Sequence, residues 1–196
     1  TTFTTEAGPF HASHGNFYAA QTFNQAPNGR VVQIGWMNGG PNAASAYGLP
    51  FNQQMSFPCE LSLKTTPDGV RLCANPVSEI ASLVSSTYQA SNQTLNATNL
   101  LAEAGPLDLA DLSIEFEPGT ASQIVIDLPR TTVRYQVSGG TLTFTDVNGN
   151  AASLVDGVVT QRAGRVKLRL LLDRLSLEGY VFDGEKFGSH YLSPAN

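Results

Sequence analysis

The segment Gly15-Asn16-Phe17-Tyr18-Ala19-Ala20-Gln21-Thr22-Phe23 decides the fold, together with the segment that follows it, Gly29-Arg30-Val31-Val32-Gln33-Ile34-Gly35-Trp36-Met37. Both segments are rich in aromatic and β-branched residues, which favour strands. Between them, Pro27-Asn28-Gly29 is a tight-turn signal. The stretch therefore predicts a β-hairpin with strands over residues 17–23 and 30–37.

The next segments predict a second hairpin and then one helix. Strands are expected over residues 57–64 and 70–74, around the turn Thr66-Pro67-Asp68-Gly69. Residues 76–88 predict a short helix, because Asn75 could cap it, Pro76 suits its first position and Glu79 falls in its first turn. This helix would connect two β-rich regions.

The chain changes to longer strands from Leu107 onward. Alternating patterns predict strands over residues 112–116, 122–128, 132–137, 142–146, 165–172 and 176–182. Turn signals such as Glu117-Pro118-Gly119 and Asn148-Gly149-Asn150 separate them. Short strands at regular spacing are typical of a β-sandwich. We therefore expect an all-β chain with three parts: a segment over 1–75, a helical linker over 76–90 and a β-sandwich over 91–196.

Composition limits the classes of function. Only 14% of the 196 residues are charged, 18 are Gly and 11 are Pro, which suits an ordered, turn-rich β protein. The net charge of -5, with scattered basic residues, argues against a nucleic-acid partner. No apolar run approaches the ~20 residues that cross a bilayer, so no membrane partner is expected. No His or Cys cluster has metal-ligand spacing, and no cofactor is predicted.

The two cysteines, Cys59 and Cys73, fall on the two arms of the second hairpin. Folding that hairpin about its turn leaves them a few residues out of register, whereas a disulfide needs Cβ atoms ~3.8 Å apart. We therefore expect two free, partly buried thiols.

In two regions the sequence of the chain resembles that of glycoside hydrolase family 32, the family of levanases, exo-inulinases and invertases. The first region runs from Gly15 to Ile80, with residues 15–23, 29–37, 49–61, 67–72 and 76–80 carrying the likeness, and it resembles the family's last propeller blade. The second comprises residues 114–121, 139–142 and 172–178 and resembles its C-terminal sandwich. The resemblance implies a five-bladed propeller joined to a β-sandwich, of which this chain carries only the last blade and the sandwich. It implies no cofactor and a secreted or periplasmic protein.

A lone blade would expose edge strands and an apolar face. We therefore expect that the chain pairs with an N-terminal propeller portion of the same enzyme, is a truncated product, or packs its blade strands differently. No secretory signal opens the chain, and we expect that its true N-terminus lies elsewhere.

The resemblance also implies a retaining mechanism, which needs a carboxylate nucleophile and a carboxylic acid ~5 Å apart. The family's nucleophile lies in Trp-Met-Asn-Asp-Pro-Asn-Gly, its transition-state stabiliser in Arg-Asp-Pro and its acid in Glu-Cys-Pro. This chain has Gly39 where the nucleophile would be, in Trp36-Met37-Asn38-Gly39-Gly40-Pro41-Asn42. Asp173-Arg174 and Cys59-Glu60 invert the other two motifs. We therefore predict no catalytic residues in this chain.

Although it lacks the catalytic residues, this chain could still contribute one wall of the sugar pocket. Trp36 matches the position where family members present an aromatic ring beside the terminal fructose, and an indole can stack on the C–H face of a sugar. The alternative is a core Trp beneath the blade. His14 and Asn16 match residues at the pocket mouth. Asn52 and Gln53 could bond sugar hydroxyls, although holding a turn is favoured.

Three interpretations of the function are therefore weighed. The first is the C-terminal part of a β-fructofuranosidase-type hydrolase that acts on a β-fructan or a sucrose-like carbohydrate and is inactive alone. The second is a non-catalytic carbohydrate-binding or structural β-sandwich module that retains a relic blade. A third, less specific interpretation is a β domain with an association role.

Overall fold

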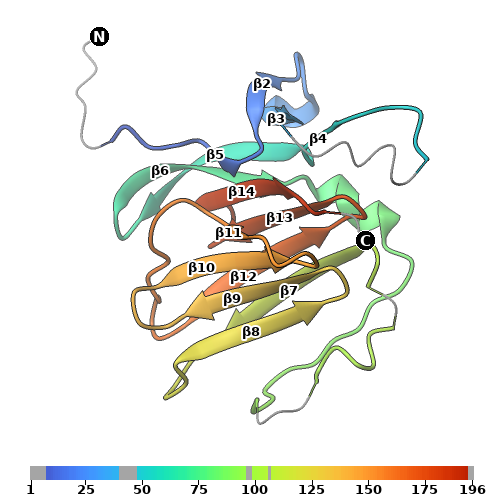
Figure 1. Cartoon of the computed structure of the whole chain (residues 1–196). Helices are drawn as coiled ribbons and strands as arrows, with labels where there is room; N and C mark the ends of the chain where they lie inside the picture. The colour runs from blue at the N-terminus through green and yellow to red at the C-terminus, as the bar shows by residue number, and fades with distance from the viewer. Residues whose placement is uncertain (1–7, 40–47, 96–98, 106, 194–196) are drawn as a thin grey trace.

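The computed structural model describes residues 8–39, 48–95, 99–105 and 107–193, and it is almost entirely β-structure (Figure 1). Among the described residues the strands form three sheets. The all-β prediction is confirmed, whereas the interpretation of the first sheet as a propeller blade stays a prediction, as does the predicted division of the chain into three parts.

The N-terminal sheet has the strand order β2-β3-β5-β6, with β4 paired to the far end of β3. Its strands are β2 (Tyr18–Thr22), β3 (Val32–Met37), β4 (Gln54–Met55), β5 (Cys59–Thr66) and β6 (Gly69–Pro76). Both predicted hairpins are present. The turn between β2 and β3 is a short 3-10 helix, η1 (Pro27–Gly29).

The C-terminal half forms two sheets that pack around one core. One sheet has the order β1-β14-β13-β12-β7 and the other β11-β10-β9-β8. Their strands are β1 (His14–Gly15), β7 (Ala110–Phe116), β8 (Gln123–Leu128), β9 (Thr131–Gln136), β10 (Thr141–Asp146), β11 (Ala151–Ser153), β12 (Val166–Leu172), β13 (Ser176–Val181) and β14 (Lys186–Tyr191). Buried residues of both sheets form one cluster, which includes Val133, Leu142, Leu168 and Leu177.

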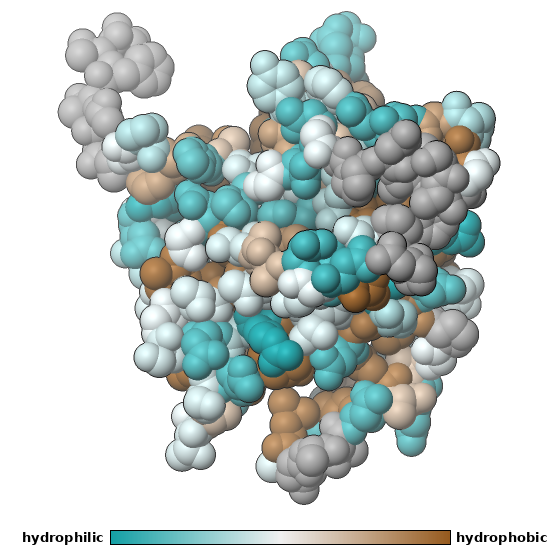
Figure 2. All heavy atoms as spheres, in the orientation of Figure 1, coloured by the Kyte–Doolittle hydropathy of each residue, from teal (hydrophilic) through white to brown (hydrophobic). Residues whose placement is uncertain are grey.

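The two sheets differ in how their outer faces are covered. In β9 and β10 buried and accessible residues alternate, as in a sheet with one solvent-facing side. Figure 2 shows hydrophilic colours predominating over this front sheet. Every residue of β13 is buried, because the N-terminal sheet packs on the outer face of its sheet. The apolar run in residues 170–172, predicted to lie in a strand covered on both faces, belongs to the same layer.

The junction between the N-terminal sheet and the C-terminal sheets has its own small core. Val32, Cys59 and Ala74 contribute from the N-terminal side, and Tyr180 and Phe187 from the other. In addition, β1 pairs in parallel with β14, so the segment before the first hairpin extends a C-terminal sheet. The N-terminal sheet therefore lies across β14 and β13, as Figure 1 shows.

Two sequence predictions need correction. The helix expected over residues 76–88, within the linker 76–90, is wrong in type and length. Pro76 ends β6, and a 3-10 helix, η2, covers only Ser78–Leu83 with Val77 as its N-cap. Asn75 pairs with Glu60 in the β5–β6 ladder and is not free to cap a helix. Strands β11 and β14 were not predicted, although β14 is an interior strand that lies between β1 and β13.

Within the described part of the chain, no helix has the length and apolar character needed to cross a bilayer.

Candidate functional site

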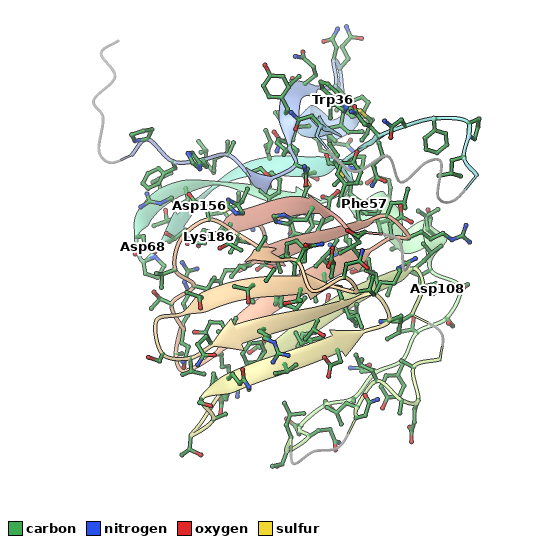
Figure 3. The ribbon with its side chains drawn as sticks, viewed as in Figure 1. Trp36, Phe57, Asp68, Asp108, Asp156 and Lys186 are labelled. Carbon is green, nitrogen blue, oxygen red and sulfur yellow. The ribbon has the colours of Figure 1, made fainter. Side chains whose placement is uncertain are left out.

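Trp36 lies on β3 at an accessible end of the N-terminal sheet (Figure 3). Its side chain is 38% exposed, so it is not the core tryptophan of the alternative interpretation. The indole Nε1–H donates to Gln53 Oε1 over 2.6 Å. Gln53 has a left-handed backbone with φ 68, so it both shapes the turn, as predicted, and fixes the indole.

Three accessible side chains form a row across neighbouring strands. Tyr18 of β2 and Met55 of β4 are the cross-strand partners of Trp36. Since cross-strand partners share one face of a sheet, the row presents its rings and thioether together. The rings of Tyr18 and Trp36 meet edge to face with centroids 6.2 Å apart. Tyr18 and Met55 are 60% and 49% exposed. The row is therefore an amphipathic surface of the kind that contacts sugars.

Asn16 and His14, the other predicted binding residues, are engaged within the protein. Asn16 Nδ2 donates to the carbonyl of Asn38, and its Oδ1 accepts from the amide of Tyr191. The ring of His14 lies 5.6 Å from that of His190. Both side chains are half-buried. They hold the N-terminal arm on β14, and the structure gives neither a position in the Tyr18–Trp36–Met55 row.

A cleft of about 440 Å³ opens between the N-terminal sheet and the turn that joins β12 to β13. We call it the junction cleft. Its lining residues are Leu49, Phe51, Gln54, Met55, Ser56, Phe57, Pro58, Asp173, Arg174 and Leu175. Met55 belongs both to this cleft and to the row that contains Trp36. Asn52, which precedes Gln53, is exposed.

A buried carboxyl group joins the two halves of the chain behind this cleft. Glu178 of β13 has no exposed surface. One carboxyl oxygen accepts from the amide of Phe57 over 2.8 Å, and the other accepts from the Tyr180 hydroxyl over 2.5 Å. The Cys59 thiol donates to the same hydroxyl. Burial raises the pKa of Glu178 to about 7, although the hydrogen bonds from Tyr180 and Phe57 act in the opposite direction.

Sequence reasoning did not single out Glu178 as a titratable group. The available signal was a lone acidic residue inside the apolar strand Ser176–Val181, because an unpaired carboxyl is rarely buried. The same surroundings affect the thiol: burial raises the pKa of Cys59 to about 12. Cys59 and Cys73 are both free and buried, which confirms the prediction of two free thiols.

The inverted family motifs have structural roles. Glu60 is a β5 residue whose carboxylate accepts from Arg30 Nε over 2.8 Å. Asp173 begins the β12–β13 turn, where its carboxylate accepts from the amide of Arg174. Gly39 follows β3, while residues 40–42 of the third near-match lie outside the described residues. Of the described residues, no three His, Cys, Asp or Glu side chains gather in a way that could hold a metal ion.

Comparison with known proteins identifies relatives of both halves of the chain. Residues 1–76 match the model of the glycosyl hydrolases family 32 N-terminal domain. A levanase from Bacillus sp. (strain L7) is 28% identical over 195 residues, which cover 91% of this chain and 21% of the levanase. A levanase from Bacillus subtilis (strain 168) is 27% identical over 206 residues, covering 91% of this chain and 29% of that protein. The chain thus spans less than a third of the curated relatives it matches.

Solved structures show the same fold over nearly the whole chain. Exo-inulinase from Aspergillus awamori superposes with a TM-score of 0.69 at 22% identity and covers 100% of this chain and 43% of its own. Fructan 1-exohydrolase IIa from Cichorium intybus superposes with a TM-score of 0.70 at 19% identity, covering 94% of this chain and 43% of its own. The resemblance predicted from sequence is confirmed by these matches.

Proposed function

From its similarity in sequence and fold to the glycosyl hydrolases of family 32, we propose that this chain is the C-terminal part of a fructan-degrading hydrolase. In this proposal the N-terminal sheet is the last blade of a five-bladed propeller, and the two C-terminal sheets are a supporting sandwich. The chain contributes a wall of the sugar site. The nucleophile, the stabilising Asp and the acid come from the N-terminal propeller portion, so this chain alone does not hydrolyse fructans.

The observation that carries the proposal is the accessible indole of Trp36. Its Nε1–H is held by Gln53, and its ring lies in a row with Tyr18 and Met55. An aromatic ring fixed in this way can stack on the apolar face of a fructosyl ring without losing further side-chain entropy. The buried Glu178 carboxyl is engaged by the Phe57 amide and the Tyr180 hydroxyl, which gives it a structural role at the junction of the two halves.

The substrate class in this proposal is a β-fructan or a sucrose-like carbohydrate, since the relatives include levanases, an exo-inulinase and a fructan exohydrolase. A polymeric fructan does not cross membranes, so we place the enzyme outside the cytoplasm, secreted or periplasmic.

The test is reconstitution. The chain is produced alone and together with a family 32 propeller portion that carries the three acidic motifs, and fructose release from levan, inulin and sucrose is measured. We expect no release by the chain alone and release by the pair, with the complex visible in native mass spectrometry. Hydrolysis by the chain alone would contradict the assignment of the acids to the other portion. A pair that associates but stays inactive would favour the non-catalytic binding module.

A further inference from the structure

We infer that the junction cleft is a second carbohydrate subsite, which binds a fructosyl unit of an oligofructoside beyond the unit held by Trp36. This inference rests on the proposed function for the identity of the sugar. It assigns a role to residues of both halves of the chain, including the β12–β13 turn.

The floor of the cleft offers apolar surface that is not already in use. Of the apolar lining residues, Phe51 is 55% exposed and Met55 is 49% exposed, whereas Leu175 is 8% exposed. A ring with a free face beside aliphatic surface suits the C–H face of a sugar. The volume of about 440 Å³ falls within the roughly 300–1,000 Å³ of small-molecule sites.

The rim provides hydrogen-bonding groups of both kinds. Among the described residues, no hydrogen bond or ion pair is recorded for the Arg174 guanidinium, and Arg174 is exposed. Asp173 uses one carboxylate oxygen for the Arg174 amide, which leaves its Oδ2 available. A guanidinium donates and a carboxylate accepts, and adjacent sugar hydroxyls require both. A neutral polyol therefore fits this rim better than an anion, which Asp173 would repel.

The walls of the cleft are held in place by bonds between the two halves. The amide of Gln54 donates to the Tyr191 hydroxyl over 3.0 Å, and its side-chain Nε2 donates to Ser176 Oγ over 2.8 Å. The amide of Phe57 donates to Glu178. These contacts fix the loop around Met55 against β13 and β14, so a ligand would find the cleft largely preformed.

The cleft is continuous with the proposed sugar site. Met55 lines the cleft and is the cross-strand partner of Trp36, so their Cβ atoms are about 5 Å apart. Gln53, which holds the indole, directly precedes the cleft residue Gln54. A chain of sugar units that starts at Trp36 can therefore continue over Met55 toward Phe51 and Arg174.

The experiment measures binding by the full chain, without any hydrolytic step. Isothermal titration calorimetry uses levan-derived and inulin-derived oligosaccharides of about four units, with fructose and a cello-oligosaccharide as comparison ligands. The cleft variants are Phe51→Ala and Arg174→Ala. Matched controls are Phe23→Ala and Arg134→Ala, which remove an exposed Phe and an exposed Arg elsewhere. Circular dichroism verifies that all four variants are folded.

We expect the oligofructosides to bind, and each cleft variant to weaken their binding by about fivefold or more, as the loss of one ring contact or one charged hydrogen bond does. The control variants and the affinity for fructose should not change. Absence of oligofructoside binding by the wild-type chain, equal binding of the cello-oligosaccharide, or unchanged affinity in both cleft variants would overturn the inference. Because binding is measured alone, a failed reconstitution of hydrolysis contradicts only the proposed function.

Discussion

The carboxyl group of Glu178 lies 2.8 Å from the amide nitrogen of Phe57, a residue 121 positions earlier in the chain. This bond crosses the junction between the N-terminal and C-terminal sheets. Tyr180 donates to the other oxygen of the same carboxyl and accepts from the Cys59 thiol. Each half of the chain thus satisfies polar groups that the other half buries.

The first prediction is that Glu178→Gln changes how stability depends on pH. The pKa of Glu178 is about 7 in the folded protein and 4.5 ordinarily. Between these values the unfolded chain has lost its proton and the folded protein retains it. Glu178 therefore stabilises the fold fully below pH 4.5, and that contribution is lost as the pH rises to 7, at about 1.4 kcal/mol per pH unit. A glutamine does not titrate, so the free energy of unfolding of Glu178→Gln should increase relative to that of wild type as the pH rises from 4.5 to 7.

The difference between the two proteins is the quantity to measure, because His190 acts in the opposite sense. Burial lowers the pKa of His190 to about 4, so its neutral form is favoured in the folded protein and stability rises with pH up to about 6.5. This effect and those of exposed groups cancel in the comparison. Urea unfolding of both proteins between pH 4 and 8 gives the difference. A constant difference over that range would show that Glu178 does not titrate there.

A second prediction concerns Gly184, in the turn between β13 and β14. A Cβ atom at this position would lie 2.0 Å from the carbonyl oxygen of Ala74, so the N-terminal sheet would have to move. Gly149 has nearly the same backbone angle, φ 81 against 83, but has open space around it. Both alanine variants carry the cost of a left-handed backbone, roughly 1–2 kcal/mol.

Only Gly184→Ala should also lose part of the junction, so we expect it to reduce the free energy of unfolding by at least about 2 kcal/mol more than Gly149→Ala. An equal decrease of the free energy of unfolding in the two variants would mean that a side chain at position 184 does not displace β6. Thermal or urea unfolding at one pH is sufficient for the comparison.

The third prediction uses Trp36, the chain's one tryptophan, as a reporter. Because the propeller portion carries a tryptophan in its nucleophile motif, the Trp36 signal is the difference between the wild-type assembly and one that carries Trp36→Phe. If the indole stacks on a sugar, its fluorescence should change when fructose or a fructan is added to the assembled enzyme. Gln53→Ala should reduce the response, because the Nε1–H loses its acceptor. Asn52→Ala, at the exposed neighbouring position, serves as the control. An assembled enzyme that hydrolyses fructan with no change in fluorescence would exclude the pocket role.

The fourth prediction is that the chain produced alone binds an apolar dye or self-associates. Leu63 and Leu72 are cross-strand partners on β5 and β6, and they are 74% and 52% exposed. Apolar surface of this kind marks an interface. Leu63→Ser with Leu72→Ser should lower the dye signal, and Val158→Ser, at an exposed position in the loop between β11 and β12, should not. A monomer that binds no dye would contradict the prediction that this surface is an interface.

The fifth prediction concerns the thiols. Burial raises the pKa of Cys59 to about 12, so little thiolate exists at neutral pH. Alkylation of the native protein should leave Cys59 unmodified, and unfolding should release both Cys59 and Cys73 as free thiols. Mass spectrometry after each step counts the modifications. Rapid native alkylation of Cys59 would indicate that the junction opens frequently.

Local sequence signals predicted most of the fold. The turn Thr66-Pro67-Asp68-Gly69 and the strands beside it were placed closely, because proline and glycine limit the backbone where the chain reverses. The helix over residues 76–88 failed for a tertiary reason. Pro76 completes the ladder opposite Cys59, and Ile80 packs into the junction, so pairing and burial outweigh the local helix signal.

The site was predicted only in part. Trp36 was identified by family resemblance, and the structure places it at the surface. The hydrogen bond from the Tyr191 amide to Asn16 and the bond from the Phe57 amide to Glu178 each join residues more than 120 positions apart, which no local pattern reveals. Strand β14 was missed for the same reason: its mixed sequence, Lys186–Tyr191, becomes a strand through the neighbours on both sides of it.

The parallel pairing of β1 with β14 has a consequence for biosynthesis. His14 and Gly15 pair with Gly188 and Ser189, so the first strand of the described chain needs one of the last residues to be made. While the ribosome is still adding the intervening residues, β1 has no β14 to pair with, and the N-terminal hairpins cannot yet pack on β13 and β14. Strands whose partners have not yet been made expose unpaired edges, and contacts between residues far apart in the sequence form slowly. Of the described strands, β1 is therefore translated first but completes its pairing only after β14 has been made.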